Sequence, residues 1–305
     1  MNILDMIGNT PLVQIYEDKN VWAKLEGANL FGSIKDRAAI YIVEKGIKEG
    51  FISQNTELIE SSSGNFAIAL AGICNIKNIK FSCVIDPLIS EVNKRILEIY
   101  KTNIIIANTC DDNGNYVKER IRIVKDILEK KTNIYWPNQY DNPIICEAYE
   151  KTIGKEIAQI RDLDYVFVAI STCGTIAGIS RALKNLKPNV KVIAVDIEGS
   201  KIFQNRNIKK YINGMGASFI PPNLNRAIID DVIISSTEES INGCMKLLEK
   251  GIFAGGSSGA VFSACMKYNQ QHNLEKHVSL CVLPDRGERY IDTIYSEQWK
   301  RKVGL

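Results

Sequence analysis

The sequence predicts an α/β fold in which mostly parallel sheets carry helices on both faces. Two observations predict it. Strand-like apolar runs alternate with helical patterns along the chain, and three turns rich in Ser, Thr and Gly follow strand-like runs and open helices. At 305 residues the chain is long enough for one large domain or two ordinary ones. The loop-like stretch 135–144 contains two prolines, so we place a junction between two α/β halves there.

Each element follows from its own local pattern. Short runs rich in Val and Ile predict strands at 21–26, 56–61, 80–86, 103–108, 164–170, 191–196 and 277–284. Apolar residues at helical spacing, or small apolar residues in succession, predict helices at 33–49, 65–76, 90–100, 115–130, 175–186 and 236–251. The last of these helices begins with Ser and Thr and ends at Gly251, as helix caps prefer.

Composition excludes several functional classes. A net charge of +3 and the lack of a basic run with interleaved aromatics argue against nucleic acid as a partner. No apolar stretch approaches the roughly 18 residues that span a bilayer, so no membrane partner is expected. The first residues lack the regions of a signal peptide, and the eight cysteines form no C-x-x-C pair. We therefore expect free thiols and a cytoplasmic protein.

With only two histidines, neither a metal site nor a histidine-based nucleophile arrangement is expected. The three small-residue turns, "SSSGN" (61–65), "STCGT" (171–175) and "GGSSG" (255–259), carry more information. A helix N-terminus offers unpaired N–H groups and partial positive charge, so it binds anions. One such turn is usually only a capped helix start. Three of them at the ends of parallel strands favour a ligand that bears a phosphate or a carboxylate.

A dinucleotide is one alternative ligand, because a strand, a turn, a helix and a strand ending at Asp196 follow one another there. The turn, however, has only Gly174 and Gly178 in place of G-x-G-x-x-G, and no Walker A loop is present. A hydroxyl-rich turn is better suited to a single terminal phosphate.

A phosphate monoester together with a well-placed lysine suggests pyridoxal phosphate, whose aldehyde needs a neutral amine. Lysine has a pKa of about 10.4, and both desolvation and a positive helix end lower it. Lys35 follows Gly32 and Ser33 at the predicted start of a helix, where both effects apply. From this stretch alone, an ordinary exposed lysine is the simpler interpretation.

A set of motifs extends the argument over nearly the whole chain. "GNTPLVQI", "KLEGANLFGSIKDR", "SSSGNFAIALA", "STCGTIAGISR", "AGGSSGA" and "LPDRGERY" occur in this order between about residues 9 and 299. The chain thereby resembles the cysteine synthase/cystathionine β-synthase family of fold-type II pyridoxal-phosphate enzymes. The resemblance implies a tryptophan synthase β-like fold with two three-layer αβα domains. Residues 36–140 would form a smaller, mobile domain, and residues 1–35 with 141–305 the cofactor-binding domain.

The resemblance also implies roles at the cofactor. Lys35 would form the Schiff base and move the α-proton, and Asn65 would hydrogen-bond the 3′-oxygen. Ser257 would face the pyridine nitrogen, where a neutral hydroxyl leaves the ring unprotonated and suits β-replacement. The phosphate would be held by Ser171, Thr172, Cys173, Gly174 and Thr175.

The substrates implied by the resemblance are small amino acids. Ser62, Ser63 and Gln139 would hold the α-carboxylate, and Arg120 and Tyr140 would recognise a second substrate. The expected chemistry is β-replacement on a β-substituted L-alanine through an aminoacrylate. The segments "VIDPLIS", "NLNRAIIDDV", "GCMKLLEKGIFAGGSSG" and "LPDRGERYIDTIYS" favour O-phospho-L-serine and L-glutamate as the pair. Arg120 lies on a charged helix, where solvation is an equally good interpretation.

Several residues depart from plain cysteine synthases. Phe66 and Ala67 replace a Thr-Gly pair, Cys173 replaces a glycine, and Asp285 and Arg286 replace a Ser-Ser pair. These departures argue against plain cysteine synthesis with sulfide as the nucleophile, which is the third alternative. The runner-up is a cysteine-consuming reaction that releases hydrogen sulfide and gives serine or lanthionine. A module that uses the cofactor only structurally would require Lys35 to be dispensable. Homodimers are usual in the family, and the apolar first residues need burial, so a homodimer is expected.

Overall fold

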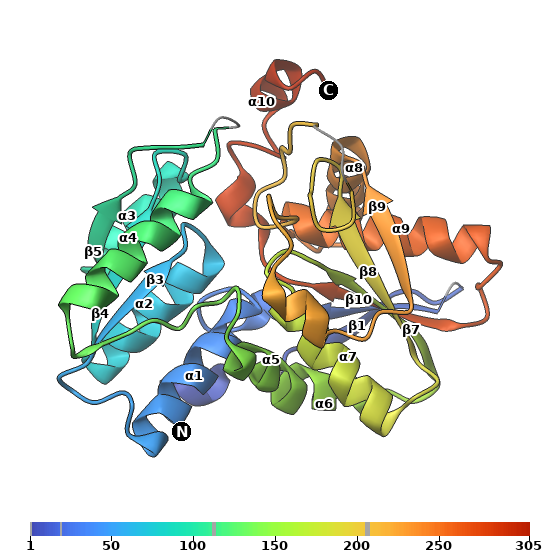
Figure 1. The fold of residues 1–305 in the computed structure, drawn as a ribbon. Helices are drawn as coiled ribbons and strands as arrows, with labels where there is room; N and C mark the ends of the chain where they lie inside the picture. Colours follow the sequence, from blue (N-terminus) through green and yellow to red (C-terminus); the bar gives the residue numbers. More distant parts are fainter. Residues whose placement is uncertain (1, 19, 112–113, 205–207) are drawn as a thin grey trace.

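The computed structural model describes residues 2–18, 20–111, 114–204 and 208–305, and it contains two sheets, one in each half of the molecule (Figure 1). The larger sheet has six strands in the order β1-β2-β10-β7-β8-β9, and only β1 and β2 pair antiparallel. Its strands are β1 (Leu12–Tyr16), β2 (Val21–Leu25), β7 (Leu163–Ala169), β8 (Lys191–Ile197), β9 (Asp231–Ser235) and β10 (Val278–Leu283).

The smaller sheet has four parallel strands in the order β5-β4-β3-β6. Its strands are β3 (Glu57–Ser61), β4 (Lys80–Ile85), β5 (Asn103–Ile106) and β6 (Ile134–Tyr135). All four lie within residues 36–140, and all six strands of the larger sheet lie outside that range. The division into a smaller mobile domain and a larger domain itself stays a prediction.

Helices cover both sheets, as their parallel strands require. They are α1 (Lys35–Glu49), α2 (Asn65–Lys77), α3 (Glu91–Ile99), α4 (Val117–Lys130), α5 (Pro143–Tyr149), α6 (Lys155–Ala158), α7 (Gly174–Leu186), α8 (Thr237–Glu249), α9 (Gly256–Gln271) and α10 (Glu297–Lys302). None of the helices in the described ranges is both long and apolar enough to cross a membrane.

Alternation along the central strands explains why both faces of the larger sheet are buried. On β7, Val166 and Val168 point into the core shared with α5 and α7, whereas Phe167 points into the core shared with α8 and α9. Each of these three side chains is at most 1% exposed. A parallel sheet with both faces covered needs such continuous apolar runs, and "YVFVA" supplies one.

The predicted α/β fold with mostly parallel sheets is confirmed. Every strand and helix predicted from the sequence has a counterpart, and all three small-residue turns open helices, namely α2, α7 and α9. The sequence reading missed the strands β1, β6 and β9 and the helices α5, α6 and α10. These elements are short, of two to seven residues, so too few turns or alternations are present to give a period.

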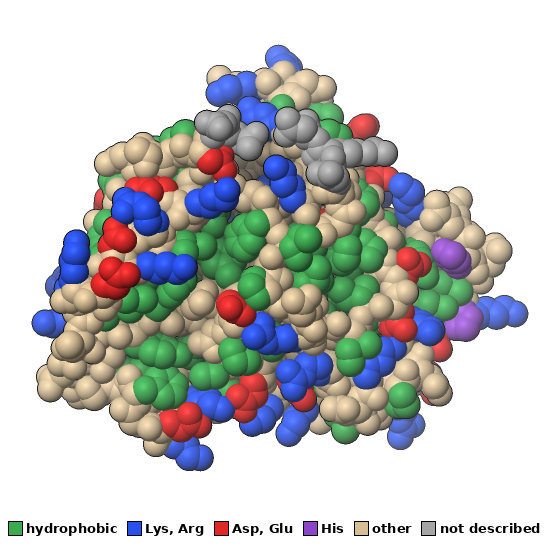
Figure 2. Space-filling model, in the orientation of Figure 1, with side chains coloured by type: hydrophobic (Ala, Val, Ile, Leu, Met, Phe, Trp, Pro, Cys, Tyr) green, Lys and Arg blue, Asp and Glu red, His purple; other side chains and the backbone are tan. Residues whose placement is uncertain are grey.

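The distribution of charged side chains on the surface is consistent with the small net charge of +3. On the face shown in Figure 2, Lys and Arg side chains alternate with Asp and Glu side chains, and hydrophobic side chains lie across its centre. Charges of both signs are thus interspersed on this face.

Candidate active site

The candidate site lies at the edge of the larger sheet where its parallel strands end. β7 and β10 are parallel neighbours, so the turn after β7 and the residues after β10 meet at one edge. Asp285, just after β10, pairs with Ser33 before α1, and its carboxylate accepts a hydrogen bond of 2.7 Å from Asn65 Nδ2 at the start of α2. The Asp285 carbonyl accepts a bond of 3.3 Å from Gly255 N, before α9. One residue thus joins the starts of three helices.

Three of these helix starts lack a side-chain cap. The N-cap residues of α2, α7 and α9, which are Gly64, Cys173 and Gly255, make no side-chain hydrogen bond to the first helical N–H groups. Ser90, Asn142, Ser236 and Ser296, in contrast, cap α3, α5, α8 and α10 with their side chains. Uncapped N–H groups need another acceptor, and an anionic ligand is one. The starts of α2, α7 and α9 therefore have N–H groups that a phosphate or carboxylate could accept from.

Lys35 is the first residue of α1, placed by a tight turn. Gly32 has a φ of +87°, which a side chain would strain, and Ser33 Oγ accepts a hydrogen bond of 3.2 Å from the Lys35 N–H. Within the described part of the chain, Lys35 Nζ makes no hydrogen bond or ion pair. Desolvation lowers the pKa of the Lys35 amine below its usual value, with Asp285 and Glu26 acting in the opposite direction. Burial thus favours the neutral form of the amine, in the direction predicted from the sequence, while the role of Lys35 toward the cofactor stays a prediction.

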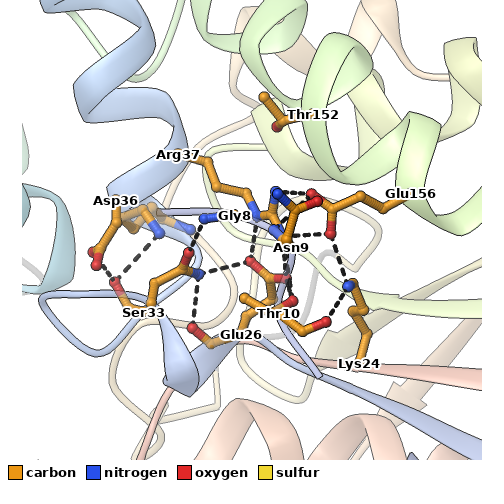
Figure 3. A network of polar contacts seen from close by, with 12 residues as sticks. Gly8, Asn9, Thr10, Lys24, Glu26, Ser33, Asp36, Arg37, Thr152 and Glu156 are labelled. Carbon is orange, nitrogen blue, oxygen red and sulfur yellow. Dashed lines mark hydrogen bonds and ion pairs between the residues drawn. The ribbon is translucent and has the colours of Figure 1, made fainter. Parts of the chain in front are cut away.

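A buried ionic network anchors the helix that carries Lys35 (Figure 3). Arg37, 1% exposed, donates to Glu26 at 2.6 Å and to Glu156 at 2.6 Å, and Lys24 pairs with Glu156 at 2.7 Å. Thr10 completes it by donating to Glu26 at 2.6 Å. Although burial opposes it, hydrogen bonding from Arg37 holds the pKa of Glu156 at about 2. The network ties α1 to β2 and α6 at a position two residues from Lys35.

The turn 171–175, the predicted phosphate cradle, runs into the first residues of α7, whose N-cap is Cys173. Cys173 has a φ of +61°, in the left-handed region, and is 2% exposed, while Ser171, Thr172 and Thr175 are half-buried. The glycine that the resemblance leads one to expect at this position would adopt this conformation without strain. Burial raises the pKa of the Cys173 thiol to about 12, so this thiol is not an activated nucleophile. Ser171 donates a hydrogen bond of 3.0 Å to the carbonyl of Gly216, which fixes the turn.

Asn65 lies at the site but is engaged by protein partners. Its Nδ2 donates to Asp285, and its Oδ1 accepts from Arg289, whose other nitrogen donates to Phe31 O at 2.6 Å. Ser257 lies in the first turn of α9 and is 5% exposed. The structure thus brings Lys35 and Asn65 close to Asp285, and Ser257 lies two residues after Gly255, which donates a hydrogen bond to the Asp285 carbonyl. The roles of these residues toward the cofactor stay predictions.

The turn 61–65 and Gln139 also come together. Gln139 Nε2 donates a hydrogen bond of 3.2 Å to Ser61 O, and Gln139 is 7% exposed. Ser62 is 6% exposed and Ser63 is half-buried. The Ser61 side chain is 0% exposed and lies at the start of this turn.

Arg120 is not on the solvated face of its helix. It is 6% exposed, and its Nη1 lies 3.3 Å from both Ser63 Oγ and Asp86 Oδ2. Its Nε is buried and has no partner among the residues that the structure describes. Tyr140 is half-buried and packs on Phe219 with ring centroids 5.4 Å apart. Arg120 thus lies beside the predicted substrate turn, and the interpretation as a solvated arginine is wrong.

Sequence reasoning missed Glu60, Asp86 and Arg289 as neighbours of the site. Burial raises the pKa of Glu60 to about 7, despite a hydrogen bond of 3.0 Å from Trp136, and Glu60 is 0% exposed. Glu60 and Asp86 lie at the ends of two adjacent parallel strands, β3 and β4, and that position could have identified them. Arg289 belongs to the "LPDRGERY" motif, which was noted without a role for this residue.

The donors present fit pyridoxal phosphate. The uncapped start of α7 suits a dianionic phosphate, the desolvated Lys35 amine suits an aldehyde, and the uncapped start of α2 suits an amino-acid carboxylate. Fold and site together define a fold-type II pyridoxal-phosphate enzyme with the tryptophan synthase β-like fold.

Comparisons with known proteins agree. The family model described as "Pyridoxal-phosphate dependent enzyme" matches residues 3–285, and the chain therefore belongs to this family. An O-acetylserine-dependent cystathionine β-synthase from Helicobacter pylori is 32% identical, with a TM-score of 0.88 over 97% of this chain and 99% of that chain. A hydrogen sulfide-producing enzyme from Fusobacterium nucleatum is 31% identical, with a TM-score of 0.86 over 95% of this chain and 99% of that chain. An O-ureido-L-serine synthase is 28% identical, with a TM-score of 0.86 over 95% of this chain and 93% of that chain. The protein is a pyridoxal-phosphate-dependent enzyme of the cysteine synthase type.

Proposed function

We propose that this enzyme joins O-phospho-L-serine to L-glutamate by β-replacement, giving N-(2-amino-2-carboxyethyl)-L-glutamate. The observation that carries the proposal is Arg120, a buried arginine beside the predicted substrate turn with an unpartnered Nε. A second substrate with two carboxylates needs a cationic partner besides the turn that holds the first substrate. Arginine suits this role because its planar fork donates two parallel hydrogen bonds to one carboxylate.

Different residues of the chain would bind the first substrate, move its α-proton and orient the second substrate. Bound pyridoxal phosphate supplies an electrophilic aldehyde and a conjugated ring that acidifies the α-proton of the attached amino acid. Ser62, Ser63 and Gln139 would hold the α-carboxylate at the uncapped start of α2. Lys35 would remove the α-proton with its neutral amine, and the β-substituent would then leave. Arg120 would orient glutamate so that its amine reaches the β-carbon.

The first expected result concerns Arg120→Ala. Phosphate release from O-phosphoserine and exchange of its α-proton with solvent deuterium should persist, because Lys35 and the carboxylate turn are intact. Formation of the glutamate adduct, measured by mass spectrometry, should slow by at least about tenfold, the factor that about 1.4 kcal/mol produces. The matched control is Arg122→Ala on the same helix, because Arg122 is exposed. Equal slowing in both variants would contradict a role for Arg120.

A cysteine-consuming reaction is the second candidate, favoured by the similarity to the hydrogen sulfide-producing enzyme of Fusobacterium nucleatum. The two candidates differ in their products. Given cysteine alone, such an enzyme would release hydrogen sulfide and form serine or lanthionine, whereas glutamate would have no effect. Incubation of wild-type enzyme with each donor, with and without glutamate, separates them. If no glutamate adduct forms with any donor, the glutamate proposal falls and the cysteine proposal takes its place.

We also propose that the enzyme is a homodimer. At the N-terminus, Leu4 is buried, whereas Ile3 and Met6 are 49% and 53% exposed. Exposed apolar side chains of this size favour association with another surface. Light scattering at micromolar concentration should give twice the mass of 34.1 kDa. A mass near that of one chain would contradict the proposal.

A further inference from the structure

The predicted phosphate turn, residues 171–175, is supported by a second loop to which the sequence reading gave no role. Ser171 Oγ donates a hydrogen bond of 3.0 Å to the carbonyl of Gly216, and Gly216 N donates one of 2.7 Å to the carbonyl of Ile170. Two hydrogen bonds in opposite directions therefore hold Gly216 against the entrance of the turn. A movement of Gly216 would change the position of Ser171 directly.

Gly216 itself is fixed by its surroundings. Its φ is +65°, and a Cβ built there would lie 2.7 Å from Ile197 Cγ2 and 2.8 Å from Ser200 Cβ, so this close approach requires a glycine. The neighbouring Met215 is 0% exposed, and its carbonyl accepts a hydrogen bond of 2.8 Å from Lys210 Nζ. Lys210 is therefore bonded to the residue next to the glycine that supports the predicted phosphate turn.

A buried carboxylate lies where the turn and this loop both approach β8. Asp196, near the end of that strand, is 0% exposed. The residue before it, Val195, accepts a hydrogen bond of 3.0 Å from Ile170 N, and the residue after it, Ile197, faces Gly216. A carboxylate in this place repels the phosphate that the turn is predicted to hold, so its charge needs a partner.

Lys210 is a cation that acts on this carboxylate. Burial raises the pKa of the Asp196 carboxyl, and the Lys210 amine acts in the opposite direction. Burial likewise lowers the pKa of Lys210 to about 8, with Asp196 acting in the opposite direction. After burial, Asp196 also contributes to the raised pKa of the Cys173 thiol in the phosphate turn. The adjacent Lys209 is exposed and lies over the Tyr211 ring, 5.3 Å from its centroid, and therefore offers a matched control for Lys210.

We propose that Lys210 is a positioning residue for the phosphate of pyridoxal phosphate, which it supports in two ways. Through the Met215 carbonyl it holds Gly216 against the phosphate turn, and through its charge it compensates Asp196 beside that turn. The inference rests on the predicted role of the turn, and therefore on the cofactor site that the proposed function uses. Lys210 needs no contact with the phosphate itself, since both effects act through neighbouring residues.

The test uses pyridoxine 5′-phosphate, which carries the phosphate but has no aldehyde for Lys35. Its dissociation constant for full-length protein freed of cofactor is measured at pH 7 by calorimetry. Lys210→Met should weaken binding by at least about tenfold, because the Asp196 carboxylate is left uncompensated, whereas Lys209→Met should bind like wild type. In Lys210→Met combined with Asp196→Asn, loss of the carboxylate should restore at least about threefold in affinity, which a purely structural role of Lys210 would not predict.

A pH comparison supplies an independent readout of the charge. The Lys210 amine is charged below its pKa of about 8 and neutral above it, whereas Lys210→Arg stays charged throughout and should retain wild-type affinity at pH 7. The second pKa of a phosphate ester is about 6, so the phosphate of the ligand keeps its charge between pH 7 and pH 9, which are about 1 unit either side of 8. Over this range wild type should lose at least about threefold more affinity than Lys210→Arg. If Lys210→Met does not fold, this comparison carries the test.

Three outcomes would overturn the inference. The first is equal affinity of Lys210→Met and Lys209→Met, and the second is a weakening in Lys210→Met that Lys210→Arg shares and Asp196→Asn does not relieve. The third is an equal loss of affinity with rising pH in wild type and Lys210→Arg. Absence of binding by wild type would instead remove the phosphate role of the turn, and the proposed function would fall with it.

Discussion

Replacing Lys35 with alanine should lower kcat by at least about 10³-fold, because the residue serves both as the amine that holds the cofactor and as the base for the α-proton. Lys35→Arg should be equally inactive, since a guanidinium stays charged and cannot accept the proton. Turnover is measured as phosphate or hydrogen sulfide release with each donor.

The control for Lys35 lies on the same helix. Lys48 is exposed in the last turn of α1, and Lys48→Ala should retain wild-type turnover. Borohydride treatment of the wild-type holoenzyme should fix the cofactor to a single peptide. A fixed peptide without Lys35, or substantial turnover by Lys35→Ala, would remove the central claim of the proposed mechanism and support a purely structural role for the cofactor.

Replacing Arg37 with methionine should destabilise the fold by about 3–5 kcal/mol, the usual cost of removing one partner of a buried ion pair. The cost arises at Glu26, which is 0% exposed and would be left as an uncompensated charge. Glu156 is less affected, because Lys24 remains as its partner at 2.7 Å. The measurement is the midpoint of urea unfolding.

Two further variants test whether the loss of stability in Arg37→Met comes from the buried charge of Glu26. Arg122 forms exposed pairs with Glu119 and Asp126, so Arg122→Met should leave the midpoint nearly unchanged. In Arg37→Met combined with Glu26→Gln, the second change removes the uncompensated charge and should restore part of the lost stability. A midpoint in Arg37→Met as high as in Arg122→Met would show that the network in Figure 3 contributes little.

The positions of the candidate site segments could be predicted, because each depends on residues close to it in the sequence. The turns 61–65, 171–175 and 255–259 open helices in the structure as they do in the sequence reading, since small residues and hydroxyls next to a strand end favour that geometry. Lys35 was likewise identifiable, because the Gly-Ser turn before it lies within three residues.

The neighbours of these segments could not be predicted. Arg120 follows Glu119 on a helix with many charges, and nothing local distinguishes it from the exposed Arg122. Its burial depends on the close approach of Ser63 and Asp86, which are 57 and 34 positions away in the sequence. The same holds for Glu26 and Glu156, which meet Arg37 only after folding.

The sequence by itself determined the α/β fold, the three small-residue turns that open α2, α7 and α9, and the lysine at the start of α1, because periodicity, caps and turn residues act over a few positions. The tertiary structure alone decided which charges are buried together and which polar atoms are left without a partner. It placed Asp285 between Lys35, Asn65 and Gly255 with one oxygen free, and it placed Arg120 against the substrate turn. The physical reason is that desolvation and pairing depend on distances between residues far apart in the chain, which no local pattern encodes.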